Sequence, residues 1–314
     1  MSEIISVIVP AYNEQGNIAE FCRLFSEMTK KTDEQYELVY IDDGSTDGTF
    51  DEIVKASKQY DFIKYKRHSL NLGLTEGLQT GFAAASGSIY VFYPADLQYL
   101  PEDIPALVSP ILKGADVSTG WKQGKYNKRF VSSIYNYISR KIFGLKVHDL
   151  NSVKAFRAEV VKDMFLRRDW HRYLIPLAAD QGYRIEEVKI RLYERKWGKS
   201  KFSIWRIPVG VLDMIAVKTQ LSLLRKPLLF LGLIGTIFFG LGTLVGLYAI
   251  YLRFIVGEGF RPMLYLVMLL IGIGLALFIL GFLAEGLAGL KEEMGVIRKK
   301  LDRLTRDRGP DSPE

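Results

Sequence analysis

The chain has 314 residues, of which 48% are hydrophobic and 25% are charged, and its formal net charge is +7. This composition excludes a disordered chain and a transporter with many membrane spans. The basic residues do not form one block and no zinc-finger or RNA-binding motif accompanies them, so nucleic acid is not expected as a partner. The single cysteine, Cys22, excludes an internal disulfide bond and a cysteine-based zinc site.

The first part of the chain alternates short apolar runs with segments of helical periodicity. The expected strands are Ile4–Val9, Leu38–Ile41, Phe62–Lys66 and Ile89–Tyr93, and the expected helices are Gly16–Lys30, a segment that ends near Tyr60, and Thr75–Ala85. Buried strands that alternate with helices are typical of βα units, so the sequence predicts an α/β domain with a mostly parallel sheet. Ligands of such sheets bind beyond the carboxyl ends of the strands.

The middle of the chain continues with mixed elements and a basic loop. The expected elements are an amphipathic helix Lys128–Phe143, a strand Val153–Phe156, helices from Ala158 and over His171–Ala179, and a strand Tyr183–Tyr193. A basic loop, Arg195–Lys201, follows this strand. The next segment, Ser203–Leu224, is expected to be an amphipathic helix suited to a membrane surface.

Two apolar segments, Pro227–Leu252 and Pro262–Ala284, contain no charged residue. Each exceeds the roughly 20 helical residues that cross a bilayer, and a buried hairpin in a soluble core is the alternative. Lysines and arginines before the first segment and after the second predict that both termini lie in the cytoplasm. Gly235, Gly240 and Gly242 permit close helix packing, which is compatible with a homo-oligomer.

These segments divide the chain into four expected parts. Residues 1–202 form the α/β domain, 203–225 a juxtamembrane helix, 226–290 two spans, and 291–314 a charged tail that is expected to be disordered after Leu301. The N-terminus has no basic region followed by a long apolar run, so a signal peptide is not expected.

Polar side chains follow three of the expected strands. Glu14 and Asp42 could accept hydrogen bonds from a base or a ribose, although Asp and Gly at these places also explain a tight turn that caps the next helix. Asp96 and the carbonyl oxygen of Gln98 are hard ligands for a divalent cation that neutralises a leaving diphosphate. A capping aspartate in a turn is the alternative for Asp96.

Several motifs together resemble glycosyltransferase family 2, which has the Rossmann-like GT-A fold. They are Pro10–Glu14, Asp42–Gly48 and Ala95–Gln98. Later motifs resemble the polyprenyl-phosphate branch of this family, which includes dolichol-phosphate mannose synthases and bacterial polyprenyl-phosphate glucosyltransferases with two C-terminal spans. These are Lys128 and Arg129 with Ser133, Asp149–Arg157, and Arg195–Lys201. The resemblance extends to about Ala284.

The resemblance implies a role for each matching residue. The nucleotide would be held by Pro10, Tyr12, Glu14, Asp42 and Asp96, and Mg²⁺ or Mn²⁺ by Asp96 and Gln98. Arg129 and Ser133, four positions apart on one helix face, would grip the acceptor phosphate. Asp149 would orient the acceptor or act as a weak base. A mobile loop with Arg195, Ser200 and Lys201 would close over the phosphates, and the same loop is also a basic patch suited to anionic lipid.

Two departures from the family pattern refine the expectation. Pro94 stands where the family commonly has the first carboxylate of an Asp-X-Asp motif, so weaker or altered metal binding is expected. The Gln-X-X-Arg-Trp pattern of processive polysaccharide synthases is missing, which favours transfer of a single sugar.

The function implied is transfer of one sugar, with inversion, from a UDP- or GDP-linked sugar to an undecaprenyl or dolichyl phosphate. The reaction would occur at the cytoplasmic face of a bacterial or archaeal plasma membrane, catalysed by an integral membrane protein. Two alternatives stay open. One is an enzyme of the same fold acting on another lipid or on a protein, and the other is a non-catalytic scaffold that binds a nucleotide sugar.

Overall fold

The computed structural model describes residues 3–124, 129–162, 164, 166–167, 169–194, 206–259 and 261–307. Within these ranges, only the backbone is described at 129–135, 206–209, 220, 222–225, 291–292, 295–296 and 298–307. The chain forms two compact units, Met1–Met214 and Ile215–Glu314. The division falls within helix α8, which spans Arg206–Arg225.

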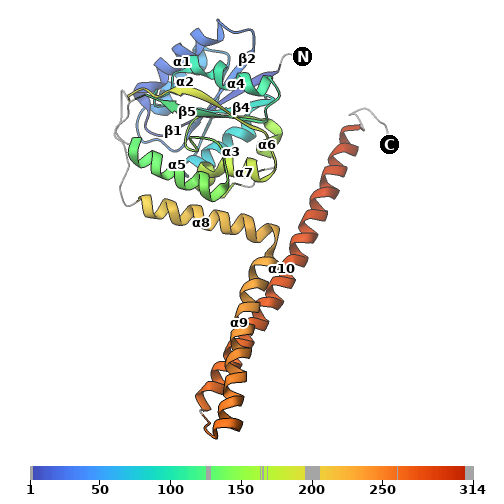
Figure 1. Cartoon of the computed structure of the whole chain (residues 1–314). Helices are drawn as coiled ribbons and strands as arrows, with labels where there is room; N and C mark the ends of the chain where they lie inside the picture. Colours follow the sequence, from blue (N-terminus) through green and yellow to red (C-terminus); the bar gives the residue numbers. More distant parts are fainter. Residues whose placement is uncertain are drawn as a thin grey trace. The chain divides into compact units, whose positions relative to one another are not determined.

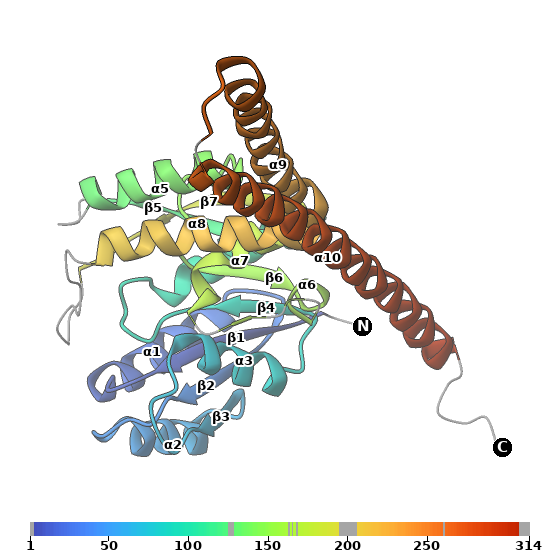
Figure 2. The same cartoon turned by 90° about the horizontal axis from the view of Figure 1, so that it is seen from below.

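The first unit contains a seven-stranded sheet in the order β3-β2-β1-β4-β6-β5-β7, which can be followed in Figure 2. Its strands are β1 (Ile4–Ala11), β2 (Gln35–Asp42), β3 (Ile63–Arg67), β4 (Ile89–Phe92), β5 (Val117–Gln123), β6 (Lys154–Arg157) and β7 (Ile185–Arg191). All neighbouring pairs are parallel except those of β6, which runs antiparallel to β4 and β5. The expected mostly parallel sheet is confirmed.

Helices cover both faces of this sheet (Figure 1). They are α1 (Gln15–Thr29), α2 (Thr49–Gln59), α3 (Leu74–Ala84), α4 (Ile104–Leu112), α5 (Arg129–Phe143), α6 (Ala158–Lys162) and α7 (Leu174–Asp180), with short 3₁₀ turns at Pro101–Asp103 and Trp170–Tyr173. Strand β5 and helix α4 were not predicted from the sequence. Strand β5 has polar residues at its buried positions and helix α4 contains two prolines, so neither shows the usual pattern.

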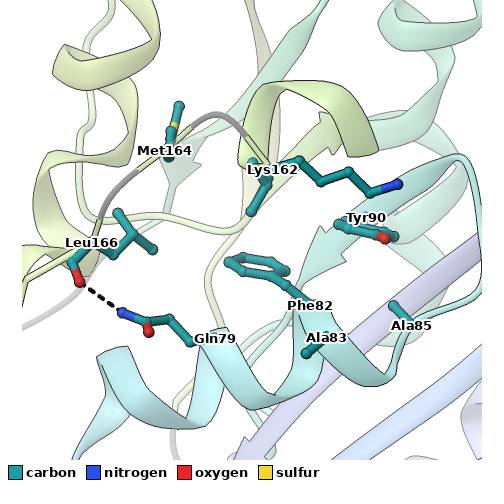
Figure 3. A pocket seen from close by; sticks show the side chains of 9 residues that line it. Gln79, Phe82, Ala83, Ala85, Tyr90, Lys162, Met164 and Leu166 are labelled. Carbon is teal, nitrogen blue, oxygen red and sulfur yellow. Dashed lines mark hydrogen bonds between the residues drawn. The ribbon is translucent and has the colours of Figure 1, made fainter. Parts of the chain in front are cut away.

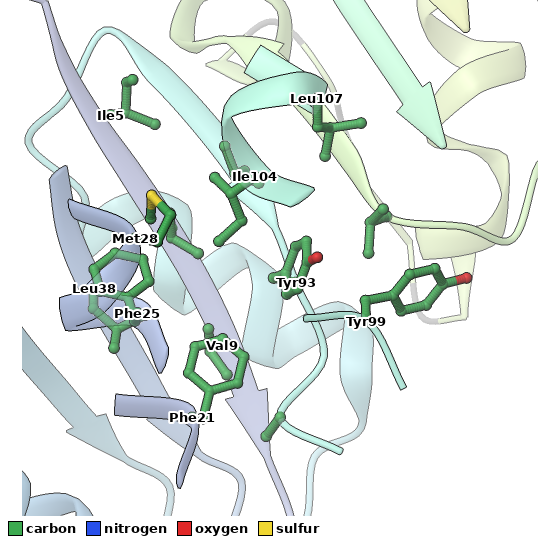
Figure 4. Close-up of a cluster of buried hydrophobic side chains, with 14 of the residues drawn as sticks. Ile5, Val9, Phe21, Phe25, Met28, Leu38, Tyr93, Tyr99, Ile104 and Leu107 are labelled. Atoms are coloured by element: carbon green, nitrogen blue, oxygen red, sulfur yellow. The ribbon is translucent and has the colours of Figure 1, made fainter. Parts of the chain in front are cut away.

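The main core lies between the sheet and the face covered by α1, α2 and α4 (Figures 1 and 4). Helix α1 contributes a buried stripe at Ile18, Phe21, Cys22 and Phe25, which has the spacing of one helix face. Burial raises the pKa of Cys22 to about 11, and its sulfur lies 3.6 Å from the Tyr40 hydroxyl. Cys22 is thus a packing residue, as its place in a helix indicated.

The opposite face of the sheet carries α3, which packs very closely on β1. A Cβ atom added at Gly81 would lie 2.3 Å from Cγ2 of Ile8, so only glycine permits this approach. The close packing fixes the start of α3, near Thr75, beside the carboxyl ends of β1 and β2.

A buried polar network ties the other end of the sheet together. The Glu37 carboxylate accepts hydrogen bonds from Ser6 Oγ (2.5 Å), from the Ser86 backbone N–H (2.6 Å) and from Ser86 Oγ (2.7 Å), and it pairs with Lys64 Nζ at 2.7 Å. Burial alone would raise the pKa of Glu37, but the hydrogen bonds and the pairing with Lys64 outweigh it and lower the pKa to about 2. The network links β1, β2, β3 and the turn before β4.

The second unit contains the last part of α8, then α9 (Pro227–Tyr251), a π-helical turn (Leu252–Val256) and α10 (Arg261–Asp307). The segments Pro227–Val256 and Arg261–Leu290 are long and apolar enough to cross a membrane, as the sequence predicted. Helix α10 continues without a break to Asp307. The expected disorder after Leu301 is therefore wrong for residues 302–307, and residues 308–314 lie outside the described part.

Glycines bring α9 and α10 into close contact. A Cβ atom at Gly235 would lie 2.6 Å from the carbonyl oxygen of Gly274, and one at Gly242 would lie 2.8 Å from Ile271 Cγ1. By contrast, a Cβ atom at Gly240 would meet no described atom within 4 Å. Two of the three glycines noted in the sequence therefore serve packing within the hairpin.

Candidate active site

The polar motifs of the first unit meet at the carboxyl edge of the parallel strands. Strand register places Ala11 beside Asp42, and Phe92 beside Lys154. Because β6 is antiparallel, its first residue, and not its last, lies at this edge. The segments that follow β1, β2 and β4 and the segment that precedes β6 therefore converge, as the sequence predicted for the strand-end motifs.

Hydrogen bonds join the loop after β1 to the loop after β2. Asn13 Oδ1 accepts a hydrogen bond from Thr46 N at 2.9 Å, and Asn13 N donates to Ser45 Oγ at 3.0 Å. Glu14 N donates to Thr49 Oγ1 at 2.8 Å. Asn13 has a φ of +57°, a left-handed conformation that Asn tolerates better than most residues. The loops hold half-buried Pro10, Tyr12 and Glu14 next to Asp42.

The Asp42 carboxylate is fully buried and only partly satisfied. Its Oδ1 accepts a hydrogen bond from Ser45 N at 3.1 Å. Its Oδ2 lies 3.1 Å from Arg67 Nε, but the two atoms are not aligned as a hydrogen bond, and Oδ2 has no hydrogen-bond partner among the described residues. A buried carboxylate oxygen without an aligned hydrogen bond is uncommon in proteins, and this one lies at the edge where sheets of this type commonly bind ligands.

The neighbouring Asp43 has a structural task instead. Its Oδ1 accepts a hydrogen bond from Leu72 N at 2.9 Å and lies 2.8 Å from His68 Nδ1, while Oδ2 accepts from Gly73 N at 2.8 Å. Three contacts occupy this carboxylate, which holds the segment before α3. Adjacent aspartates of one motif thus have different contacts.

The loop after β4 contains the predicted metal ligands. Asp96 is 7% exposed, and its Oδ1 accepts a hydrogen bond from Gln98 N at 3.1 Å. Leu97, between them, has a φ of +54°, an uncommon conformation for a residue with a bulky side chain. Strain of this kind costs about 1–3 kcal/mol and clusters at functional sites. The main-chain oxygen of Gln98 accepts a hydrogen bond from Tyr193 N at 2.8 Å, which makes the side-chain oxygen the better candidate ligand.

This loop fits a divalent cation only together with substrate. The described residues contain no group of three or more His, Cys, Asp or Glu side chains that could hold a metal. Asp96 and Gln98 supply two oxygen atoms, and Pro94 supplies none from its side chain. Mg²⁺ commonly binds one or two protein oxygens and completes its shell with phosphates and water, so the donor set is compatible with a substrate-bound ion.

The turn before β6 fixes Asp149. Asp149 is 2% exposed, its Oδ1 accepts a hydrogen bond from Asn151 N at 2.9 Å, and its Oδ2 lies 3.3 Å from Lys122 Nζ. Glu187 of β7 accepts hydrogen bonds from the backbone N–H groups of His148 (2.7 Å) and Asp149 (3.2 Å), and it also contacts the His148 ring at 2.6 Å. The carboxylate of Asp149 is therefore held in one place.

A second lysine is buried beside this turn. Lys154 is 2% exposed, and its Nζ donates to the carbonyl oxygen of Ser152 at 2.6 Å. Burial lowers the pKa of Lys154 to about 7, Asp149 opposes this change, and Lys122 adds to it. Lys122 and Lys154 thus both lie beside the Asp149 carboxylate.

His171 borders the same cluster and is neutral at pH 7. Burial, followed by the charges of Arg172 and Lys154, lowers its pKa to about 3. Its Nδ1 lies 3.0 Å from Thr75 Oγ1 at the start of α3. This contact joins the lysine cluster to the segment that Asp43 holds.

Residues 6–165 match the model of the family described as glycosyl transferase family 2. The chain belongs to glycosyltransferase family 2. A dodecaprenyl-phosphate galacturonate synthase from Rhizobium johnstonii is 31% identical over 301 residues, which cover 90% of this chain and 87% of that protein. An undecaprenyl-phosphate 4-deoxy-4-formamido-L-arabinose transferase from Pseudomonas fluorescens is 28% identical over 261 residues, which cover 81% and 75%.

Solved structures share the fold of this glycosyltransferase. Glucosyl-3-phosphoglycerate synthase from Mycobacterium tuberculosis, crystallised with Mn²⁺, UDP and phosphoglyceric acid, has a TM-score of 0.55 at 20% identity. The match covers 70% of this chain and 78% of that chain. The expected GT-A fold is confirmed.

Several predicted site residues lie outside the described structure. The backbone of Arg129 and Ser133 belongs to α5, but their side chains are not described. The basic loop with Arg195, Ser200 and Lys201 is likewise outside the described residues. The roles given to these five residues stay predictions, as do the roles given to the described site residues.

The structure adds residues that the sequence analysis missed. Lys122 belongs to β5, which has no apolar run to mark it. Lys154 had a readable signal, since it is the one charged residue between Val153 and Phe156. Glu187 carried no signal, because alternating charges along β7 also suit an exposed strand.

A cavity of about 480 Å³ lies elsewhere, between α3 and α6 (Figure 3). It is lined by Gln79, Phe82, Ala83, Ala85, Tyr90, Val161, Lys162, Met164 and Leu166. Tyr90 is the second residue of β4, so the cavity lies away from the carboxyl edge, and its lining has one charged side chain. It does not suit a nucleotide diphosphate, and the strand-end cluster is the better candidate site.

Proposed function

We propose that this glycosyltransferase moves a single sugar, with inversion, from a UDP- or GDP-linked sugar to a polyprenyl phosphate. The proposal depends on one observation: the segments that contain Asp42, Asp96 and Asp149 lie at the same edge of the sheet. Lys122 and Lys154 lie beside the segment of Asp149. The names of the two relatives, which are transferases or synthases of polyprenyl-phosphate sugars, support the acceptor class.

The donor nucleotide would occupy the side of the edge formed by β1 and β2. Asp42 Oδ2, which is buried and has an ion pair with Arg67 but no aligned hydrogen bond, would accept a hydrogen bond from the base or the ribose. Pro10, Tyr12 and Glu14 would line the same place, held by the hydrogen bonds of Asn13.

The diphosphate would lie near the loop after β4. Asp96 and the side-chain oxygen of Gln98 would hold Mg²⁺ or Mn²⁺, whose bound charge would stabilise the leaving diphosphate. Arg195, Ser200 and Lys201 would contribute further positive charge and a hydroxyl from the basic loop. The synthase from Mycobacterium tuberculosis was crystallised with UDP and Mn²⁺ and also with UDP and Mg²⁺, which supports a test with both metal ions.

The acceptor phosphate would lie near Asp149 and Lys122, with Arg129 and Ser133 as further contacts. One of its oxygens, already anionic, would attack the anomeric carbon, and the bond from that carbon to the diphosphate would break. Because this oxygen needs no deprotonation, a strong base is not required. Asp149 is ion-paired and fixed by the turn, which favours an orienting role over proton abstraction.

The lipid tail of the acceptor would lie in the bilayer that α9 and α10 cross. The basic residues at the outer ends of the spans favour a cytoplasmic location for both termini and for the catalytic domain. In this arrangement residues 1–202 form the catalytic domain, 203–225 a helix at the membrane surface, 226–290 the spans and 291–314 a cytoplasmic tail.

The test is a transfer assay with the purified full chain in detergent. A panel of nucleotide sugars is offered with and without undecaprenyl phosphate, in Mg²⁺, Mn²⁺ or EDTA. We expect transfer with one nucleotide sugar that requires both the lipid phosphate and a metal. Asp96→Ala is expected to lose at least 100-fold, and Asp61→Ala, which changes an exposed aspartate away from the edge, is expected to lose nothing.

Three outcomes would overturn parts of the proposal. Transfer without a polyprenyl phosphate would indicate another acceptor, and nucleotide binding without turnover would indicate a scaffold. Full metal-dependent activity in Asp96→Ala would refute the metal assignment.

A further inference from the structure

One buried hydrogen bond joins the two halves of the candidate site. The hydroxyl of Tyr99 and Oγ of Ser152 are 3.2 Å apart, and the residues are 6% and 2% exposed. Tyr99 directly follows Gln98 of the donor loop, and Ser152 belongs to the turn that begins at Asp149. The contact therefore spans 53 positions of sequence and connects the loop after β4 to the turn before β6.

Ser152 is closely confined on its own side. Its carbonyl oxygen accepts the 2.6 Å hydrogen bond from buried Lys154, and a Cβ atom at Gly120 would lie 2.7 Å from its Oγ. Both the main chain and the side chain of Ser152 are thus held against β5 and β6. The turn continues to Asp149, whose Oδ1 accepts from Asn151 N.

Tyr99 is confined on the other side. Its ring packs edge-on against Tyr93 with centroids 6.1 Å apart, at the border of the main core (Figure 4). The residue before it, Gln98, is held by hydrogen bonds to Asp96 Oδ1 and from Tyr193 N. A shift of Tyr99 would therefore move the predicted metal ligands.

We propose that the Tyr99–Ser152 hydrogen bond is a positioning bridge that fixes the donor loop relative to the acceptor turn. The inference rests on the proposed function, in which these two segments hold the leaving diphosphate and the attacking phosphate. In-line transfer needs reacting atoms about 3–3.5 Å apart, and an error of about 1 Å can cost about 100-fold in rate. Both residues act through their neighbours and are not catalytic residues.

The experiment is a double-mutant cycle on the full chain with Tyr99→Phe, Ser152→Ala and both together. Two matched controls remove a buried hydroxyl elsewhere. Tyr40→Phe removes the hydroxyl near Cys22, and Ser118→Ala removes a hydroxyl that has no hydrogen-bond partner among the described residues. The readouts are kcat, both KM values, the melting temperature and calorimetric binding of the nucleotide in Mn²⁺.

We expect each single variant to lower kcat at least tenfold, with each KM and the nucleotide affinity changed less than threefold. The double variant is expected to be no slower than the slower single variant, because both changes break the same bond. Neither control is expected to lower kcat more than twofold. If the hydrogen bond served stability alone, the variants would melt at a lower temperature but keep the wild-type kcat at temperatures where they are folded.

The bridge is refuted if the single variants keep kcat within threefold of the wild type, or if their losses multiply in the double variant. A single variant that fails to fold also refutes it, because the bond would then be needed for folding and not for positioning. Transfer by the wild type to a different acceptor would refute the proposed function alone, and the same kcat comparison would still test the bridge. A wild-type chain that transfers to no acceptor would overturn both.

Discussion

Replacing Glu37 by Gln should destabilise the first unit in a manner that depends on pH. In the folded chain the carboxylate receives hydrogen bonds from Ser6 and Ser86 and pairs with Lys64, and its pKa falls from the ordinary 4.5 to about 2. That difference corresponds to about 3.5 kcal/mol at about 1.4 kcal/mol per pH unit. The Lys64 side chain is 51% exposed, so solvent screening reduces the expected loss to about 2 kcal/mol.

The sign follows from the lowered pKa. The stabilisation is fully present above pH 4.5 and is lost as the pH falls from there toward 2, because the folded state resists protonation of Glu37. The difference between wild type and Glu37→Gln should thus be about 2 kcal/mol at pH 7 and less than half of that at pH 3, where the folded carboxylate is still mostly ionised.

The assay is urea unfolding of the full chain in detergent, followed by tryptophan fluorescence. The four tryptophans all precede residue 214 in sequence, so the signal reports on the first unit. Glu52→Gln is the control, because it breaks a long, partly exposed pair with Lys55 at 3.6 Å and should cost less than about 1 kcal/mol at either pH. A loss that is equal at pH 7 and pH 3, or absent at pH 7, would contradict the reasoning.

Three further changes test other parts of the structure. Gly81→Ala should destabilise the first unit by about 1–3 kcal/mol through overpacking, as measured by urea unfolding. Gly77→Ala on the same helix should be tolerated, because the nearest atom to an added Cβ lies at 3.4 Å. Gly235→Leu should loosen the α9–α10 hairpin and Gly240→Leu should not, as judged by protease resistance in detergent. Burial and the adjacent acid raise the pKa of Asp103 to about 6, so Asp103→Asn should raise the melting temperature above pH 6, and the gain should vanish near pH 4.

The sequence predicted the part of the fold around β1 and β2 well because these strands are continuous apolar runs closed by turn residues. Ile4–Val9 and Leu38–Ile41 are such runs, and the motif aspartates follow directly from where they end. The pattern could not locate β5, in which Ser118 and Thr119 are buried and Gly120 follows, because burial there depends on neighbours distant in sequence.

The different contacts of the individual site residues could not be predicted from the sequence. Asp42 and Asp43 look equivalent in the sequence, and only the return of the chain at Leu72 and Gly73 shows that the second is occupied. The burial of Lys154 likewise depends on the closing of β6 against β4 and β5, which no local pattern specifies.

The reversed direction of β6 has a consequence for how such enzymes change their acceptors. Since this strand starts at the edge where the parallel strands end, the segment entering it can gain or lose residues without shifting the βα units of β1 and β2. On the proposed function, exchanging the stretch between β5 and β6 with that of a relative that uses a different lipid carrier should alter acceptor choice, provided that Ser152 and its partner are kept.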